Sequence, residues 1–365
     1  MAADIVRPGV VLAAPDSFKG TAGAVEIADA VARGAADAGR VCDPCPLSDG
    51  GEGFAVAMAT AQGVGGSQGP AQPQGAGRWC ETTVAGPLGS PAVARWWLAD
   101  TASGPVAILE SAGASGLALV GGAAGNDPMA ASTQGTGELL VAAARAGARR
   151  VVLGVGGSAT TDGGRGALDA VDEAGGLGDV ELIVACDVDL PFVDAARVFG
   201  PQKGADPGQV AALTERLVAL AADYRDRFGV DVAAMAGAGA AGGLAGGLAA
   251  LGARLVPGFE LVAEATGLRR RLGAAGLVVT GEGRLDPTSW SGKVVGGVLA
   301  LAAEVGRPAL VVAGSVDPAW HSGLGELPPP TVVDLSERFG AGPAREEPAR
   351  CVTEAVRAEL SLGRD

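Results

Sequence analysis

The chain has 365 residues, of which 48% are hydrophobic, and a formal net charge of -14. This length and apolar content are enough to bury a large core and lie nearer to two domains than to one. The negative charge argues against binding to nucleic acid or to an anionic membrane surface, because both require basic patches. An acidic small-molecule substrate would therefore have to be held by a few local cations.

The start of the chain, MAADIVRPGVVLAAPDS, lacks the long apolar run of a signal peptide and is interpreted as leading into a first strand. No bulky apolar run reaches the roughly 18 residues that a membrane-spanning helix needs. The five cysteines are odd in number and widely spread, which favours reduced thiols. Cys42 and Cys45 have the spacing of a redox motif but fall in a probable strand. We expect a soluble cytoplasmic protein, either monomer or homodimer.

Short apolar runs bounded by turn residues alternate with longer helical stretches near both ends of the chain, as is typical of parallel βαβ units. Strands are expected at Val10–Ala14, Val41–Leu47, Leu277–Thr280, Ala309–Ala313 and Thr331–Leu335. Helices are expected at residues 22–38, 52–62, 292–306 and 346–360. Five strands joined by crossover helices predict an α/β fold with a flavodoxin-like or Rossmann-like parallel sheet.

The middle of the chain has a different pattern. A Gly/Pro/Gln-rich run, Gly63–Gly77, is interpreted as a flexible connection, and it is followed by tryptophan-bearing segments that look like hairpins and by a long Gly/Ala stretch. An inserted, mixed α/β domain is the simplest account. The predicted domains are residues 1–66 plus 276–365 for the parallel-sheet domain and residues 67–275 for the insertion.

Polar residues follow three of the predicted strands, at the edge where open α/β sheets bind ligands. They are Asp16, Ser17 and Lys19 after the first strand, Asp49 after the second, and Glu282, Arg284 and Asp286 after the third. We expect these side chains to face one crevice.

A glycine-rich loop, GGSATTDGG at residues 156–164, follows a predicted strand at Val151–Val155. Bare amides and hydroxyls suit phosphate oxygens, although a tight strand-to-helix turn would show the same composition. No Walker motif is present. Two weak dinucleotide-like fingerprints, Gly154–Ala159 and Gly237–Gly242, keep a nicotinamide-dependent oxidoreductase open as an alternative. A non-catalytic sensor that binds a small acid is a second alternative.

Acid-base chemistry must rest on carboxylates and lysines, because His321 is the only histidine. Phosphoryl transfer needs little more than positioning, magnesium, a cation and an Asp that accepts the hydroxyl proton. All three lysines, Lys19, Lys203 and Lys293, lie in glycine-flanked polar motifs. The alternative for each strand-end Asp is a local helix N-cap.

Nine motifs, in order, resemble the class-I bacterial glycerate kinase family. They are APDSFKG (14–20), SDGGEG (48–53), ASTQGTGEL (131–139), GVGGSATTDGG (154–164), ACDVD (185–189), FGPQKGA (199–205), GAGAAGGL (237–244), PGFEL (257–261) and TGEGRLD (280–286). The resemblance spans nearly the whole chain. It implies a two-domain α/β kinase that uses ATP and Mg²⁺ to convert D-glycerate to 2-phosphoglycerate in glycerate and glyoxylate catabolism. Thr161, Leu190 and residues 287–291 depart from the family pattern, so a related small hydroxy acid stays open as the acceptor.

The motifs supply the candidate site residues. Catalytic roles are expected of Asp187 and Asp189 first, and then of Asp16, Asp49 and Lys19. Substrate is expected to contact Ser17, Lys19, Glu282, Arg284 and Asp286. The nucleotide is expected to contact Gly156, Gly157, Ser158, Thr160, Thr161 and Lys203, with Lys293 as a secondary candidate. The metal is expected at Asp187 and Asp162.

Overall fold

The computed structural model describes residues 9–61, 77–290 and 292–361. Its contacts divide the chain into two compact units. Among the described residues, unit 1 holds 9–49, 56–61, 259–290 and 292–361, and unit 2 holds 50–55 and 77–258. The predicted domain boundary after residue 66 and all but the last residue of the predicted connection Gly63–Gly77 lie outside the described residues.

Unit 1 is built on a five-stranded sheet whose neighbouring strands are all parallel. Its strands are β1 (Val10–Ala13), β2 (Cys42–Pro44), β9 (Ala275–Leu285), β10 (Ala309–Val316) and β11 (Thr331–Asp334). Their order, β11-β10-β9-β1-β2, reverses between β1 and β9, which is the switch point of a flavodoxin-like sheet. All five predicted strands, and the predicted sheet type, are confirmed.

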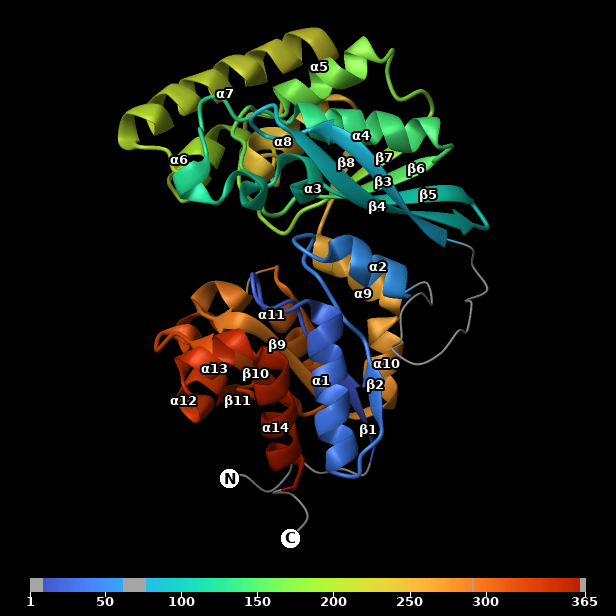
Figure 1. Ribbon diagram of the computed structural model, residues 1–365, viewed down its shortest axis with the longest axis vertical. Coiled ribbons are helices and arrows are strands. Elements are labelled where there is room, and N and C mark those ends of the chain that lie inside the picture. Colours follow the sequence, from blue (N-terminus) through green and yellow to red (C-terminus); the bar gives the residue numbers. More distant parts are fainter. Residues whose placement is uncertain (1–8, 62–76, 291, 362–365) are drawn as a thin grey trace. The chain divides into compact units, whose positions relative to one another are not determined.

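Helices cover both faces of this sheet. The helices of unit 1 are α1 (Ala24–Asp37), α10 (Leu268–Ala274), α11 (Val294–Glu304), α12 (Leu335–Phe339), α13 (Ala341–Glu346) and α14 (Pro348–Ser361), together with α2 (Phe54–Ala61) and α9 (Gly258–Thr266), whose first residues belong to unit 2. On one face α1 and α14 lie side by side (Figure 1), and a Cβ atom at Gly34 would lie only 2.5 Å from the Thr353 carbonyl oxygen. The four predicted helices correspond to α1, α2, α11 and α14. The other four have no predicted counterpart.

Apolar residues at helical spacing explain why α1 packs where it does. Ile27 and Val31, four residues apart, are both 1% exposed and contact the same core as Val11 and Leu277 of the sheet. On the opposite face Leu299 of α11 packs against the sheet residues of a second, smaller core. The sheet is therefore buried on both faces, as a parallel sheet requires.

Unit 2 has a six-stranded mixed sheet in the order β3-β4-β5-β6-β7-β8. The strands are β3 (Gly77–Ala85), β4 (Pro91–Thr101), β5 (Gly104–Glu110), β6 (Arg150–Gly154), β7 (Glu181–Ala185) and β8 (Arg254–Val256). The pairs from β3 to β5 are antiparallel and those from β5 to β8 are parallel. The expected mixed α/β character of the insertion is confirmed.

The helices of unit 2 pack on this sheet and on one another around a large core. They are α3 (Ala112–Ser115), α4 (Gln134–Arg145), α5 (Arg165–Glu173), α6 (Ala195–Phe199), α7 (Pro207–Phe228) and α8 (Leu244–Ala250). The longest, α7, begins with a capping box formed by Asp206 and Gln209 and ends at Gly229 with φ 73°. Among the described helices, none has both the length and the apolar content to cross a bilayer.

Candidate active site

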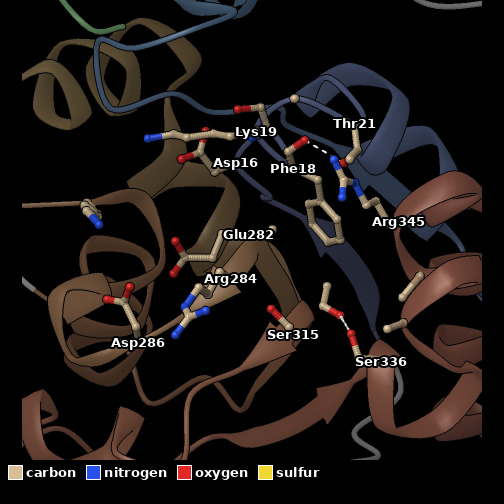
Figure 2. A pocket seen from close by; sticks show the side chains of 17 residues that line it. Asp16, Phe18, Lys19, Thr21, Glu282, Arg284, Asp286, Ser315, Ser336 and Arg345 are labelled. Carbon is tan, nitrogen blue, oxygen red and sulfur yellow. Dashed lines mark hydrogen bonds between the residues drawn. The ribbon is translucent and has the colours of Figure 1, made fainter. Parts of the chain in front are cut away.

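A cavity of about 600 Å³ opens at the carboxyl ends of β1, β9 and β10 in unit 1 (Figure 2). It lies beside the switch point between β1 and β9, where open α/β sheets bind ligands. Seven of the predicted residues line this pocket, namely Asp16, Ser17, Lys19, Glu282, Arg284, Asp286 and the secondary candidate Lys293. The loop after β1 and the end of the neighbouring strand β9 thus meet at one cavity, because the carboxyl ends of parallel strands lie at the same edge of the sheet.

Asp16 is the most buried carboxylate of the pocket, with 4% of the residue exposed. Its backbone N–H donates to the Gly281 carbonyl oxygen of β9 at 2.9 Å, and its Oδ1 accepts from the Ser17 N–H at 2.7 Å. Burial, together with the charge of Asp49, raises the pKa of the Asp16 carboxyl from 3.8 to about 8, against the opposing effect of Lys19. In the free protein this group therefore holds a proton near neutral pH.

Lys19 brings a cation to the same place. Its Nζ lies 3.5 Å from Asp49 Oδ2, and its side chain is 60% exposed whereas that of Asp49 is 12% exposed. Burial lowers the pKa of the Lys19 ammonium, but the carboxylates of Asp49 and Asp16 outweigh this, so the net shift is upward. The exposed ammonium remains charged and within reach of an acidic ligand.

Two buried oxygens of the pocket wall have no hydrogen-bond partner within the described chain: Ser17 Oγ and Glu282 Oε1. Buried polar atoms are nearly always paired, so orphan atoms in a cavity wall indicate a place for ligand atoms. Burial also raises the pKa of the Glu282 carboxyl, although a hydrogen bond from Ser289 and the charge of Lys293 oppose it.

The remaining predicted residues of the pocket already have protein partners. Arg284 forms an ion pair with Asp317 at 2.7 Å. Asp286 accepts hydrogen bonds from the N–H and the hydroxyl of Thr288, and these bonds lower the pKa of its carboxyl. Lys293 Nζ donates to Thr288 Oγ1 at 2.7 Å. Asp286 therefore caps the short 3-10 turn Pro287–Trp290, which is the local capping role given above as the alternative for strand-end Asp residues.

The predicted phosphate loop belongs to unit 2, and its hydroxyls face the interior. Thr160 and Thr161 are 0% exposed. Lys203, 6% exposed, donates to Ser158 Oγ at 2.8 Å and to the Thr160 carbonyl oxygen at 2.6 Å, and burial lowers the pKa of its ammonium to about 7. Thr160 Oγ1 and Thr161 Oγ1 are buried and have no hydrogen-bond partner within the described chain. Contact of these four side chains with nucleotide phosphates stays a prediction. Within the loop, Gly156 is half-buried and Gly157 is exposed.

Asp162 also has a structural environment. Its Oδ2 accepts from the Thr133 N–H and hydroxyl, both at 2.8 Å, and its Oδ1 from the Gly164 N–H at 3.1 Å, at the start of α5. Both oxygens therefore accept hydrogen bonds from the chain, and the metal role of Asp162 stays a prediction. The described residues contain no group of three or more His, Cys, Asp or Glu side chains placed to hold a metal.

Asp187 and Asp189 follow β7 in unit 2 and do not line the pocket of unit 1. Asp187 Oδ1 accepts from the Gly258 N–H at 2.8 Å, and Asp189 is exposed. Their catalytic role, and the metal role of Asp187, stay predictions.

Four polar residues of the pocket were not among the sequence candidates: Thr21, Ser315 near the end of β10, Ser336 in α12 and Arg345 in α13. Ser315 is the second residue after a predicted strand, as are Asp16 and Glu282. Ser336 and Arg345 come from two short helices that carry no recognisable motif.

Comparisons with known proteins extend over both units. Residues 11–175 and 174–325 match the model of the glycerate kinase family. An uncharacterised protein of Mycobacterium tuberculosis is 42% identical, over 84% of this chain and 79% of its own length. Escherichia coli glycerate 2-kinase is 37% identical, over 84% and 85%. A crystal structure assigned to glycerate kinase 2 of Salmonella typhimurium LT2 aligns with a TM-score of 0.74 at 32% identity, covering 98% of this chain and 100% of that one.

Proposed function

Because the chain belongs to the glycerate kinase family, we propose that it transfers the γ-phosphoryl group of ATP to D-glycerate and forms 2-phosphoglycerate. One observation carries this proposal: the pocket of unit 1 sets the buried carboxyl of Asp16 beside the exposed ammonium of Lys19. A hydroxy acid needs a cation for its carboxylate and a proton acceptor near its hydroxyl, and these two side chains are suited to those tasks.

In the proposed reaction Lys19 holds the carboxylate of the acid, and the orphan Ser17 Oγ forms a hydrogen bond with it. The glycerate hydroxyl oxygen attacks the γ-phosphorus, the bond from that phosphorus to the ADP oxygen breaks, and the hydroxyl proton passes to the Asp16 carboxylate. Asp16 must be ionised before this step. Its raised pKa makes it a strong proton acceptor once ionised. Arg284, a second cation of the pocket, stabilises the negative charge on the transferred phosphoryl group.

The pocket also fits the magnesium ion that the family implies. Proteins commonly hold Mg²⁺ through one or two carboxylates together with phosphate oxygens and water, so a cluster of three protein ligands is not needed. Glu282, whose Oε1 is buried and without a partner in the described chain, is the side chain that fits. When bound, the ion neutralises negative charge on the phosphates.

We also infer a place in glycerate and glyoxylate catabolism and in the cytoplasm. The family resemblance, the reduced state expected of the cysteines and the dependence of the proposed reaction on ATP support this. The departures at Thr161 and in the 287–291 stretch, whose last residue lies outside the described chain, make acceptor choice the first property to measure.

The test is ADP release by the purified chain with ATP, Mg²⁺ and D-glycerate. L-Glycerate, glycolate and no acceptor serve as controls, and NMR identifies the phosphoglycerate isomer. We expect turnover that depends on D-glycerate and yields the 2-phosphate. Turnover with glycolate but not with D-glycerate would show that glycolate is the acceptor. No turnover with any acceptor would overturn the phosphotransfer assignment.

A matched pair of variants tests the role of Lys19. Lys19→Met should raise the KM for D-glycerate at least about tenfold, because an ion pair with the acid is lost. Arg33→Met removes an exposed cation of α1 that does not line the pocket, and should leave the KM unchanged. An equal response of both variants would refute a specific role for Lys19.

A further inference from the structure

The pocket of unit 1 is much larger than the acid assigned to it. Its volume is about 600 Å³, within the range of cavities that hold drug-sized ligands. A three-carbon acid held by Asp16 and Lys19 would fill only a small part of that space. The rest of the cavity extends toward Ser315, Ser336 and Arg345, so a second and larger ligand has room there.

Arg345 is distinguished from the other cations of the pocket by its lack of a partner. Lys19 pairs with Asp49, Arg284 with Asp317, and Lys293 donates to Thr288. Arg345 is exposed, and for it the described chain provides neither an ion pair nor a hydrogen bond. An unpaired guanidinium on a cavity wall, in a protein of net charge -14, is suited to a phosphate group.

The helix that carries Arg345 is anchored in the core by the preceding residue. Ala344, the preceding residue of α13, is 4% exposed and belongs to the core formed with α1 and α14. In Figure 2 the Arg345 side chain extends from its helix toward the turn that contains Phe18 and Thr21, on the opposite side of the pocket from Arg284. The two guanidinium groups thus flank the space that the acid leaves open.

The wall beneath this space is held rigidly. Ser336 Oγ donates to the Gly314 carbonyl oxygen at 2.6 Å, which ties α12 to the end of β10. A Cβ atom at Gly314 would lie 2.5 Å from the Gly283 carbonyl oxygen, so only glycine allows β9 and β10 to approach this closely here. A preorganised wall of backbone and short hydroxyl side chains leaves room for a bulky anionic ligand.

We propose that this outer part of the pocket binds the phosphates of the nucleotide, with Arg345 as their cation. The nucleotide would then be held by unit 1, and not by the hydroxyls of the 158–161 loop in unit 2, which are buried. This inference rests on the proposed kinase function and assigns its nucleotide site.

Isothermal titration of the full chain with ADP and Mg²⁺ tests this assignment. Arg345→Ala should weaken ADP binding at least tenfold, and Arg345→Lys, which keeps the charge, should recover part of the loss. Two controls should stay within twofold of the wild type: Arg33→Ala, which removes an exposed cation of α1 outside the pocket, and Thr160→Val, which removes a hydroxyl of the loop in unit 2. In steady state, Arg345→Ala should raise the KM for ATP and leave that for D-glycerate unchanged.

The outcomes separate this inference from the function on which it rests. Unchanged ADP binding by Arg345→Ala, with acceptor-dependent turnover intact, would overturn the nucleotide site alone. So would a tenfold loss of ADP binding in Thr160→Val, or a rise in the KM for D-glycerate instead of ATP. Loss of ADP binding in Arg345→Ala, with no acceptor-dependent turnover by the wild type, would support the nucleotide site and refute the kinase function.

Discussion

Asp16→Asn should stabilise the protein while it abolishes activity. The carboxyl has a pKa of about 8 in the folded protein against 3.8 for the ordinary group, chiefly because it is buried. The folded state therefore binds more protons than the unfolded state between these two values, and stability falls as the pH rises through that window. An amide of the same shape does not ionise, so the variant escapes this loss.

The size of the effect follows from the shift. Each pKa unit corresponds to about 1.36 kcal/mol, so the roughly four units between 3.8 and about 8 set an upper limit of about 5–6 kcal/mol near pH 8. Relaxation and water entry reduce this, and we expect about 1–2 kcal/mol, which is a rise in Tm of roughly 2–6 °C near pH 8. Near pH 4 the two proteins should melt together. The kcat should fall at least about a hundredfold, because the proton acceptor is gone.

Thermal melts of wild type and variant across the pH range, with kcat from ADP release, test this. Asp37→Asn, at an exposed carboxylate at the end of α1, is the control and should change neither property. A lower Tm for Asp16→Asn near pH 8, with activity retained, would show that Asp16 serves as a cap and would refute both the linkage argument and its catalytic role.

Three further predictions concern unit 2. Burial lowers the pKa of Lys203 to about 7, so the free energy of unfolding of the wild type should increase as the pH rises from neutral toward the ordinary pKa of 10.5. Urea titrations of Lys203→Met should not show this increase. The same dependence of stability on pH in both proteins would contradict the argument. Gly242→Ala should lower the free energy of unfolding by at least about 2 kcal/mol, because φ is 68° and the new Cβ would lie 2.0 Å from the Thr160 carbonyl oxygen. The control Gly273→Ala, where a Cβ would meet nothing within 4 Å, should be neutral or stabilising. Asp206→Ala removes the capping box of α7 and should cost about 1 kcal/mol in chemical denaturation; no change would mean that the helix end frays already.

The parallel sheet was predictable because its strands are short apolar runs that stop at glycine or polar residues. Helices α1 and α14 were predictable from apolar residues at helical spacing, such as Ile27 and Val31. Helices α12 and α13 were missed because five and six residues are too few to show a period. Helices α9 and α10 fall in the stretch 258–274, which was assigned to the predicted insertion, and no helix was predicted there.

The site was only partly predictable, for a different reason. Asp16 and Glu282 lie together because the carboxyl ends of neighbouring parallel strands must meet. Asp162 shows the same sequence signal, an acidic residue after a strand, yet its oxygens cap a helix. The sequence does not reveal which packing partner covers a residue, so the burial of Lys203 could not be foreseen either.

The insertion of unit 2 between β2 and β9 bears on the order in which the chain can fold during synthesis. In the sheet of unit 1, Leu12 pairs with Val278 and Ala13 with Val279, so the centre of that sheet joins residues from the two ends of the chain. Until β9 has left the ribosome, β1 has an unpaired edge, and such edges invite association with other chains. Unit 2 is complete by residue 258 and can form first. The pocket that holds Asp16 and Glu282 must be among the last parts of the molecule to form, so a chain that ends before β9 lacks it.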